Sequence, residues 1–191
     1  MVEMKLGKEY KKSWKFLKEC RTHILIVIIL FFLAGLIGFL FPVFFTDFIK
    51  RFIEDVISKT AGMNGWQLFL FILQNNFLAS CAGFLTGIFV GVPSLFYTLL
   101  NGYVLGFVAG KSVAAAGSGV LLRLLPHGIF ELPALFISLV LGLKIGLFVF
   151  TRQKQRFSRV FTRALVTFIL IVIPLLIVAA VIETGLIVLI K

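Results

Sequence analysis

Five polar or ionisable residues stand inside long apolar stretches of this sequence, where side chains with chemical function are unexpected. They are Asn75, Asn76, Asn101, His127 and Glu131. On a helix, His127 and Glu131 would lie one turn apart on the same face and could interact directly. A charged carboxylate is costly in hydrocarbon, so Glu131 is expected to be protonated, paired or in contact with water.

Two kinds of chemistry are open to this set. The residues could form an interhelical hydrogen-bond lock, or they could act directly on an ion, a proton or a ligand. As a metal site the set is too small, because zinc takes three or four protein ligands. The sequence contains no nucleophile elbow, phosphate loop or zinc-protease motif, and His23 is its only other histidine. We expect no metal, no cofactor and no enzymatic activity.

The composition shows what kind of molecule must position these residues. Of the 191 residues, 60% are hydrophobic and 14% are charged, and the mean hydropathy is +1.10. A soluble domain is about half apolar and about a quarter charged. The apolar runs are continuous over about twenty residues, whereas the strands of a membrane barrel alternate over about ten. We therefore predict an all-α membrane protein, a bundle of about five transmembrane helices with short amphipathic interfacial helices.

The pattern along the chain predicts a single polytopic membrane domain. Its expected elements are a basic amphipathic helix over 1–22, spans over 23–45, 66–91, 93–116, 126–150 and 164–190, an interfacial helix over 46–60, and a basic helix over 151–163. Asn101-Gly102 is a turn-type dipeptide, so a break in the third span is an alternative to a continuous helix.

Basic residues lie at the ends of the apolar segments and give a net charge of +11. This distribution indicates lipid headgroups and topology and argues against nucleic acid. By the positive-inside rule, we expect a multi-pass protein of the cell membrane with its N-terminus in the cytoplasm and its C-terminus outside. In 151–163 four arginines share one face and are expected to contact lipid headgroups, although a specific protein partner is the alternative. They are Arg152, Arg156, Arg159 and Arg163.

Glycines recur every fourth residue in three spans and allow helix backbones to approach closely. The residues are Gly83, Gly87, Gly91, Gly102, Gly106, Gly110, Gly142 and Gly146. They favour a tightly packed bundle or a homodimer seam, with a pore-lining surface as a further alternative. Asn76 and Glu131 each lie on a small-residue stripe, and we expect these stripes to meet in the interior with Asn101. Glu131 would then lie about 7 Å from the outer end of its helix, in a wet vestibule.

The order of these motifs resembles the stage II sporulation protein M family of integral membrane proteins. The resemblance covers roughly residues 66–150 and rests on Gln74-Asn75-Asn76, Gly83 with Gly87, Asn101-Gly102 with Gly106, and the run from Leu125 to Ala134. Its most specific part is Pro126-His127-Gly128 followed by Glu131-Leu132-Pro133-Ala134. The resemblance implies a multi-span protein with no recognised catalytic activity. In spore formers, the named member looks like a membrane anchor for cell-wall hydrolases during engulfment.

Two functions follow as hypotheses. The first is a non-enzymatic membrane scaffold or anchor, assembling as a homo-oligomer or with other membrane or cell-envelope proteins. The alternative is a small transporter or channel whose path is lined by Asn76, Asn101, His127 and Glu131, since interrupted helices often form transport sites.

Overall fold

The computed structural model describes residues 2–87, 91–148, 150 and 157–190, with the backbone alone for 2–5, 122–127 and 190. The regular structure of these residues is entirely helical. Within the described residues, five helices are long and apolar enough to cross a bilayer, namely those over Arg21–Leu40, Gly65–Thr86, Val92–Ala116, Gly128–Phe148 and Phe157–Leu189. The predicted fold class, an all-α membrane bundle, is confirmed.

The first span ends earlier than predicted from the sequence. Helix α1 (Val2–Glu19) is followed by α2 (Arg21–Leu40), which at 20 residues is about 30 Å long and matches the hydrocarbon core. It ends at Leu40, and not at residue 45, because Pro42 cannot continue the helical hydrogen bonds. Phe45 then takes a left-handed backbone conformation with φ 55° and leads into α3 (Thr46–Thr60).

The next two spans have well-defined starts. Helix α4 (Gly65–Thr86) begins with a capping box, in which the Gln67 N–H donates to Asn64 Oδ1 at 2.9 Å and the Asn64 N–H donates to Gln67 Oε1 at 3.0 Å. Helix α5 (Val92–Ala116) starts after Gly91, whose φ of 75° suits glycine, and runs continuously through Asn101-Gly102. The chain therefore does not adopt the break considered for this span.

The last two spans also differ from their expected bounds. A short 3-10 turn, η1 (Ser118–Val120), leads into α6 (Leu121–Phe148), which starts before the expected Pro126. Helix α7 (Phe157–Thr167), the π segment η2 (Phe168–Val172) and α8 (Ile173–Ile190) follow one another directly. The basic helix expected over 151–163 is thus continuous with the fifth span from residue 157, and residues 151–156 lie outside the described part. Pro174 removes one helical hydrogen bond just beyond the π segment, a site where such irregularities are common.

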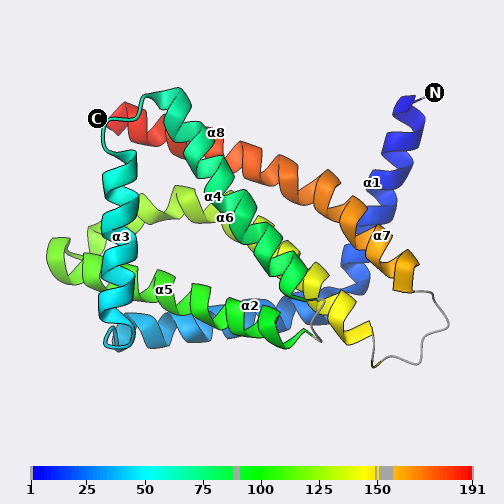
Figure 1. Ribbon diagram of the computed structural model, residues 1–191, viewed down its shortest axis with the longest axis horizontal. Coiled ribbons are helices and arrows are strands. Elements are labelled where there is room, and N and C mark those ends of the chain that lie inside the picture. Colours follow the sequence, from blue (N-terminus) through cyan, green and yellow to red (C-terminus); the bar gives the residue numbers. More distant parts are fainter. Residues whose placement is uncertain (1, 88–90, 149, 151–156, 191) are drawn as a thin grey trace.

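The helices form two groups that share α6. Helix α2 packs along α5, helices α4, α6 and α8 pack on one another, and α6 also contacts α2 and α5. Figure 1 shows α3 running across one end of the molecule, near the C-terminus, while α1 and α7 lie at the other end with the N-terminus. The termini are therefore at opposite ends, as an odd number of crossings requires.

Candidate functional site

The first glycine seam joins α2 to α5. A methyl group at Gly106 would collide with the carbonyl oxygen of Gly35, and one at Gly38 would collide with that of Tyr103. A methyl group at Gly110 would lie 2.7 Å from the carbonyl oxygen of Phe39. The α5 glycines therefore permit a backbone-to-backbone contact within the chain. Their partners on α2 were not predicted from the sequence, although the Gly35-x-x-Gly38 spacing indicated a second small-residue face.

The second glycine seam joins α4 to α6. A methyl group at Gly142 would lie 2.6 Å from the carbonyl oxygen of Gly83, and one at Gly87 would collide with the Gly142 backbone. Gly91 belongs to the turn between α4 and α5, and its added methyl group would lie 2.7 Å from Leu143 Cδ1 on α6. Gly146 is buried. The glycine series of α4 and α5 thus pack against α6 and α2 respectively, and not against each other.

Contacts in the second seam show which residues of α6 lie at the same height in the bundle as Asn76. Gly83 faces Leu139 and Gly87 faces Gly142, so α4 and α6 run in the same direction. Asn76 lies about two turns before Gly83 and is therefore level with Glu131. Asn76 is only 6% exposed, and no hydrogen bond joins its side chain to another described residue. The predicted approach of the two stripes is consistent with this register.

The depth of this pair differs from expectation. Asn76 lies halfway along α4. Because α6 begins at Leu121, Glu131 is about 15 Å from the start of its helix, and not about 7 Å. Its Oε2 atom is buried, and the residue is engaged in an interaction within the chain. The pair therefore lies deeper in the bundle than expected, where a carboxylate and an amide could lock helices or take up a proton or cation.

The other candidate residues are placed differently. Asn75 is exposed, and the side chain of His127 is outside the described part. Asn101 is half-buried and donates from its amide to the carbonyl oxygen of Tyr97 at 2.8 Å, within its own helix. Among the described residues, no three His, Cys, Asp or Glu side chains are grouped to hold a metal ion.

Two polar residues of α8 were missed as interior groups. The Oε2 atom of Glu183 and the hydroxyl oxygen of Thr184 are both buried. Gly65 faces Val188, and the ring of Phe77 contacts that of Phe168, so the fifth span runs antiparallel to α4. Glu183 therefore lies nearer the start of α4 than Asn76 does. The signal was present in the sequence, because Leu176, Ala180 and Glu183 recur at helical spacing.

Several buried hydroxyl groups bond to backbone carbonyls. Thr98 donates to Ser94 O and Ser138 donates to Ala134 O, both at 2.8 Å and both within one helix. Ser94 instead reaches across the α4–α5 turn and donates to Gly83 O at 3.1 Å. These bonds serve helix ends and helix packing.

Tyr103 of α5 fixes the turn between α2 and α3. Its hydroxyl oxygen accepts from the Phe44 N–H at 2.9 Å, and its proton can be donated to Phe41 O at 3.0 Å or Phe44 O at 3.2 Å. The start of α3 is therefore tied to the bundle by one side chain.

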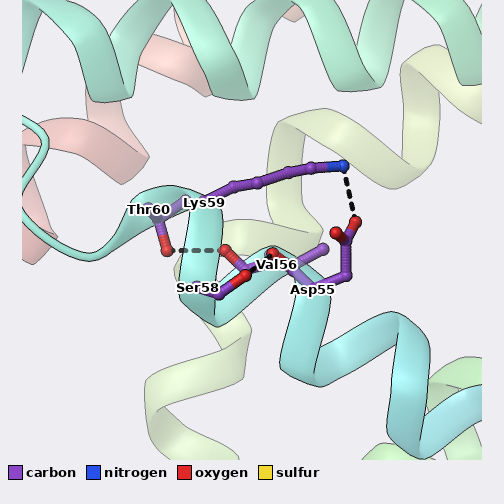
Figure 2. A network of polar contacts seen from close by, with 5 residues as sticks. All are labelled: Asp55, Val56, Ser58, Lys59 and Thr60. Carbon is purple, nitrogen blue, oxygen red and sulfur yellow. Dashed lines mark hydrogen bonds and ion pairs between the residues drawn. The ribbon is translucent and has the colours of Figure 1, made fainter.

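Local bonds stabilise the second half of α3, as Figure 2 shows. Lys59 pairs with Asp55 at 2.6 Å, and the Ser58 and Thr60 hydroxyls each donate at 2.9 Å, to Asp55 O and Val56 O. Ile49 is the one buried residue of the helix. Its large apolar side chains Phe48, Phe52 and Ile57 are exposed outside the bundle.

The opposite end of the molecule is basic. Arg159 and Arg163 of α7 are exposed, whereas Arg152 and Arg156 lie outside the described residues.

Cys20, between α1 and α2, is fully buried, and burial raises the pKa of its thiol to about 11 even though the charge of Lys144 acts in the other direction. A thiol with so high a pKa is a packing group and not a nucleophile at neutral pH.

The family model that matches this chain is that of stage II sporulation protein M, over residues 27–186. The match begins within α2 and ends within α8, so it includes both glycine seams as well as Asn76 and Glu131. The chain belongs to the stage II sporulation protein M family. The resemblance noted in its sequence motifs is thus confirmed, and the chain is a multi-pass membrane protein.

One curated relative is an uncharacterised protein of the archaeon Methanocaldococcus jannaschii. It is 32% identical over 116 residues, which are 61% of this chain and 48% of the relative. The match therefore spans about half the length of that protein. No solved structure matches the chain.

Proposed function

We propose that this member of the family is a non-enzymatic membrane scaffold or anchor that holds a partner protein of the membrane or cell envelope through α3. The observation that carries the proposal is the position of α3. It lies across one end of the bundle, outside the five spans, and Tyr103 ties its start to α5.

The two faces of α3 support a docking role. Phe48, Phe52 and Ile57 lie on the side that also holds the buried Ile49. The opposite side carries charged residues of both signs, Lys50, Arg51 and Glu54, while the paired Asp55 and Lys59 lie at its edge next to Phe48. An interfacial helix places its apolar face in the headgroup region and its charged face in water. The charged face is then available to a partner.

The glycine seams favour a rigid support beneath this helix. Backbones that touch along α2–α5 and α4–α6 leave little room for sliding, because packed interfaces do not deform continuously. Both seams lie within one chain, so assembly with a second copy would have to use other surfaces. A second copy bound through α3 is therefore a form of the same proposal.

Charge sets the proposed orientation. The end that carries α1 and Arg159 and Arg163 would face the cytoplasm by the positive-inside rule. Helix α3 and the C-terminus would then face outside, where cell-envelope proteins are found.

Site-specific photo-crosslinking in native membranes tests the scaffold. A photoreactive residue at Glu54, on the charged face of α3, is expected to capture a protein, and the adduct mass will distinguish a second copy from another partner. The matched control is Leu33 of α2, which is 53% exposed on a spanning helix and should capture lipid. If both positions capture only lipid, the scaffold proposal is wrong.

A small transporter or channel is the second candidate, and a specific observation favours it. Asn76 and Glu131 lie level with each other near mid-height of α4, and transport sites commonly lie near the bilayer midplane. A flux that depends on the Glu131 carboxylate would support this candidate over the scaffold.

A further inference from the structure

A pocket of about 380 Å³ lies between α1 and α7, at the end of the molecule opposite α3. This volume is within the range of small-ligand sites. Lys12, Ser13 and Phe16 line it from α1, and Arg159, Arg163 and Thr167 line it from α7. Residues from two elements that are far apart in sequence thus form one concave surface.

The arginines give the pocket its net positive charge. Arg159 and Arg163 lie one turn apart, and no described carboxylate pairs with either of them. The acidic residue of the pocket, Glu9, is already paired with Lys12 at 2.5 Å. Guanidinium groups are well suited to phosphate because their planar donors can bind two oxygens at once.

A hydroxyl group that is open to the pocket is the second, independent indication of a ligand. Ser13 is only 3% exposed, and no hydrogen bond joins it to another described residue. Thr167, in the same pocket, is satisfied because it donates to Arg163 O at 2.7 Å. The Ser13 Oγ is not among the described side-chain atoms that are fully buried without a partner, so it stays open to the pocket that Ser13 lines. The Ser13 hydroxyl is therefore free to donate to a ligand oxygen.

The position and the apolar side of the pocket indicate the source of that ligand. The pocket lies where the amphipathic α1 meets the start of the fifth span, and Phe16 and Val166 add an apolar surface to it. An inorganic phosphate ion would gain nothing from that surface, whereas the glycerol and first methylene groups of a lipid would pack on it. Clusters of basic residues next to a span are typical sites for anionic lipids.

We propose that the α1/α7 pocket binds the phosphate of an anionic lipid headgroup. Arg159 and Arg163 pair with the phosphate oxygens, Ser13 donates a hydrogen bond, and Phe16 contacts the glycerol region. This site is independent of the proposed role of α3, because the two lie at opposite ends of the molecule.

The proposal is tested on the full-length protein in a neutral detergent by lipid titration, with thermal unfolding as the readout. Phosphatidylglycerol is expected to raise the unfolding temperature, and phosphatidylcholine at the same mole fraction is not. Arg159→Gln/Arg163→Gln should weaken the apparent affinity for phosphatidylglycerol by roughly fivefold for each arginine removed. The matched control is Lys11→Gln/Lys15→Gln on α1, which removes the same charge from exposed positions outside the pocket lining and should bind as the wild type does.

Three outcomes would overturn the proposal. Equal weakening in both double variants would show general attraction to a basic protein. Inorganic phosphate that stabilises the protein as much as phosphatidylglycerol, and that prevents the lipid effect, would assign the pocket to a free anion. Ser13→Ala keeps every charge and is expected to weaken binding by roughly fivefold. If this variant binds phosphatidylglycerol with wild-type affinity, the lipid does not bind in the α1/α7 pocket. This conclusion holds even if the arginine variant does not fold.

Discussion

At the scale of single residues, hydroxyl groups complete the hydrogen bonding of the ends of the spanning helices. The last carbonyl groups of an α-helix have no partner within it, and near the bilayer such groups need one. Tyr103 supplies a donor for Phe41 O, just after α2, and accepts from the Phe44 N–H. Ser94 donates to Gly83 O near the end of α4.

Removal of the Tyr103 hydroxyl tests this role. In Tyr103→Phe, the Phe44 N–H loses its acceptor, so the free energy of unfolding should fall by about 1–3 kcal/mol. Hydrogen exchange should also become faster at the start of α3. Tyr10→Phe on the exposed face of α1 is the matched control and should change neither quantity. Unchanged exchange at residues 44–49 in Tyr103→Phe would contradict the role.

The sequence indicated Asn76 and Glu131 as interior polar residues, but it did not indicate the role of Tyr103. Asn76 and Glu131 stand out because polar groups on small-residue stripes are visible in helical periodicity. The bond from the Phe44 N–H to the Tyr103 hydroxyl oxygen joins residues 59 apart, and nothing local to either residue indicates it. Glu183 could not be placed from the sequence, because an acid near the end of an apolar run has the same pattern whether it faces water or the interior.

At the scale of elements, glycine spacing predicts close packing without naming the partner. The series on α4 and α5 are adjacent in sequence and could have faced each other. The structure pairs them with α6 and α2 instead, which depends on how the helices diverge after the turn near Gly91. The bounds of the helices also depend on more than the local sequence. Pro42 follows the end of α2, whereas Pro126 lies within α6.

A single added methyl group should disrupt the first glycine seam. Gly106→Ala places Cβ against the Gly35 carbonyl oxygen, which is backbone and cannot rotate away. Overpacking of this kind costs about 1–3 kcal/mol, so the unfolding temperature in detergent should fall by several degrees.

Gly185→Ala on α8 is the control for that substitution. It has nothing within 4 Å of the added methyl group, and alanine is the better helix former. Its unfolding temperature should be equal to or higher than that of the wild type. Equal stability of Gly106→Ala and Gly185→Ala would contradict the close contact between α2 and α5.

At the scale of the whole molecule, the five spans form a support with a different helical surface at each end. The basic α1 and α7 lie at one end and the mixed-charge α3 at the other. A support of this kind suits a scaffold, and its interior polar groups would then serve to hold helices together. The scaffold and transporter accounts differ most in the role that they give to Asn76 and Glu131, which lie near mid-height of α4.

The effect of Glu131→Gln on stability and on flux, measured on the same reconstituted protein, is the most direct test. In the scaffold account, the substitution lowers the free energy of unfolding by roughly 1 kcal/mol, as for other interhelical polar contacts in membranes. Proteoliposomes with either form should then leak protons and small ions no faster than empty vesicles. Glu54→Gln on α3 controls for loss of a carboxylate. A flux that the native protein supports and that Glu131→Gln abolishes, at an unchanged unfolding temperature, would contradict the scaffold and establish transport.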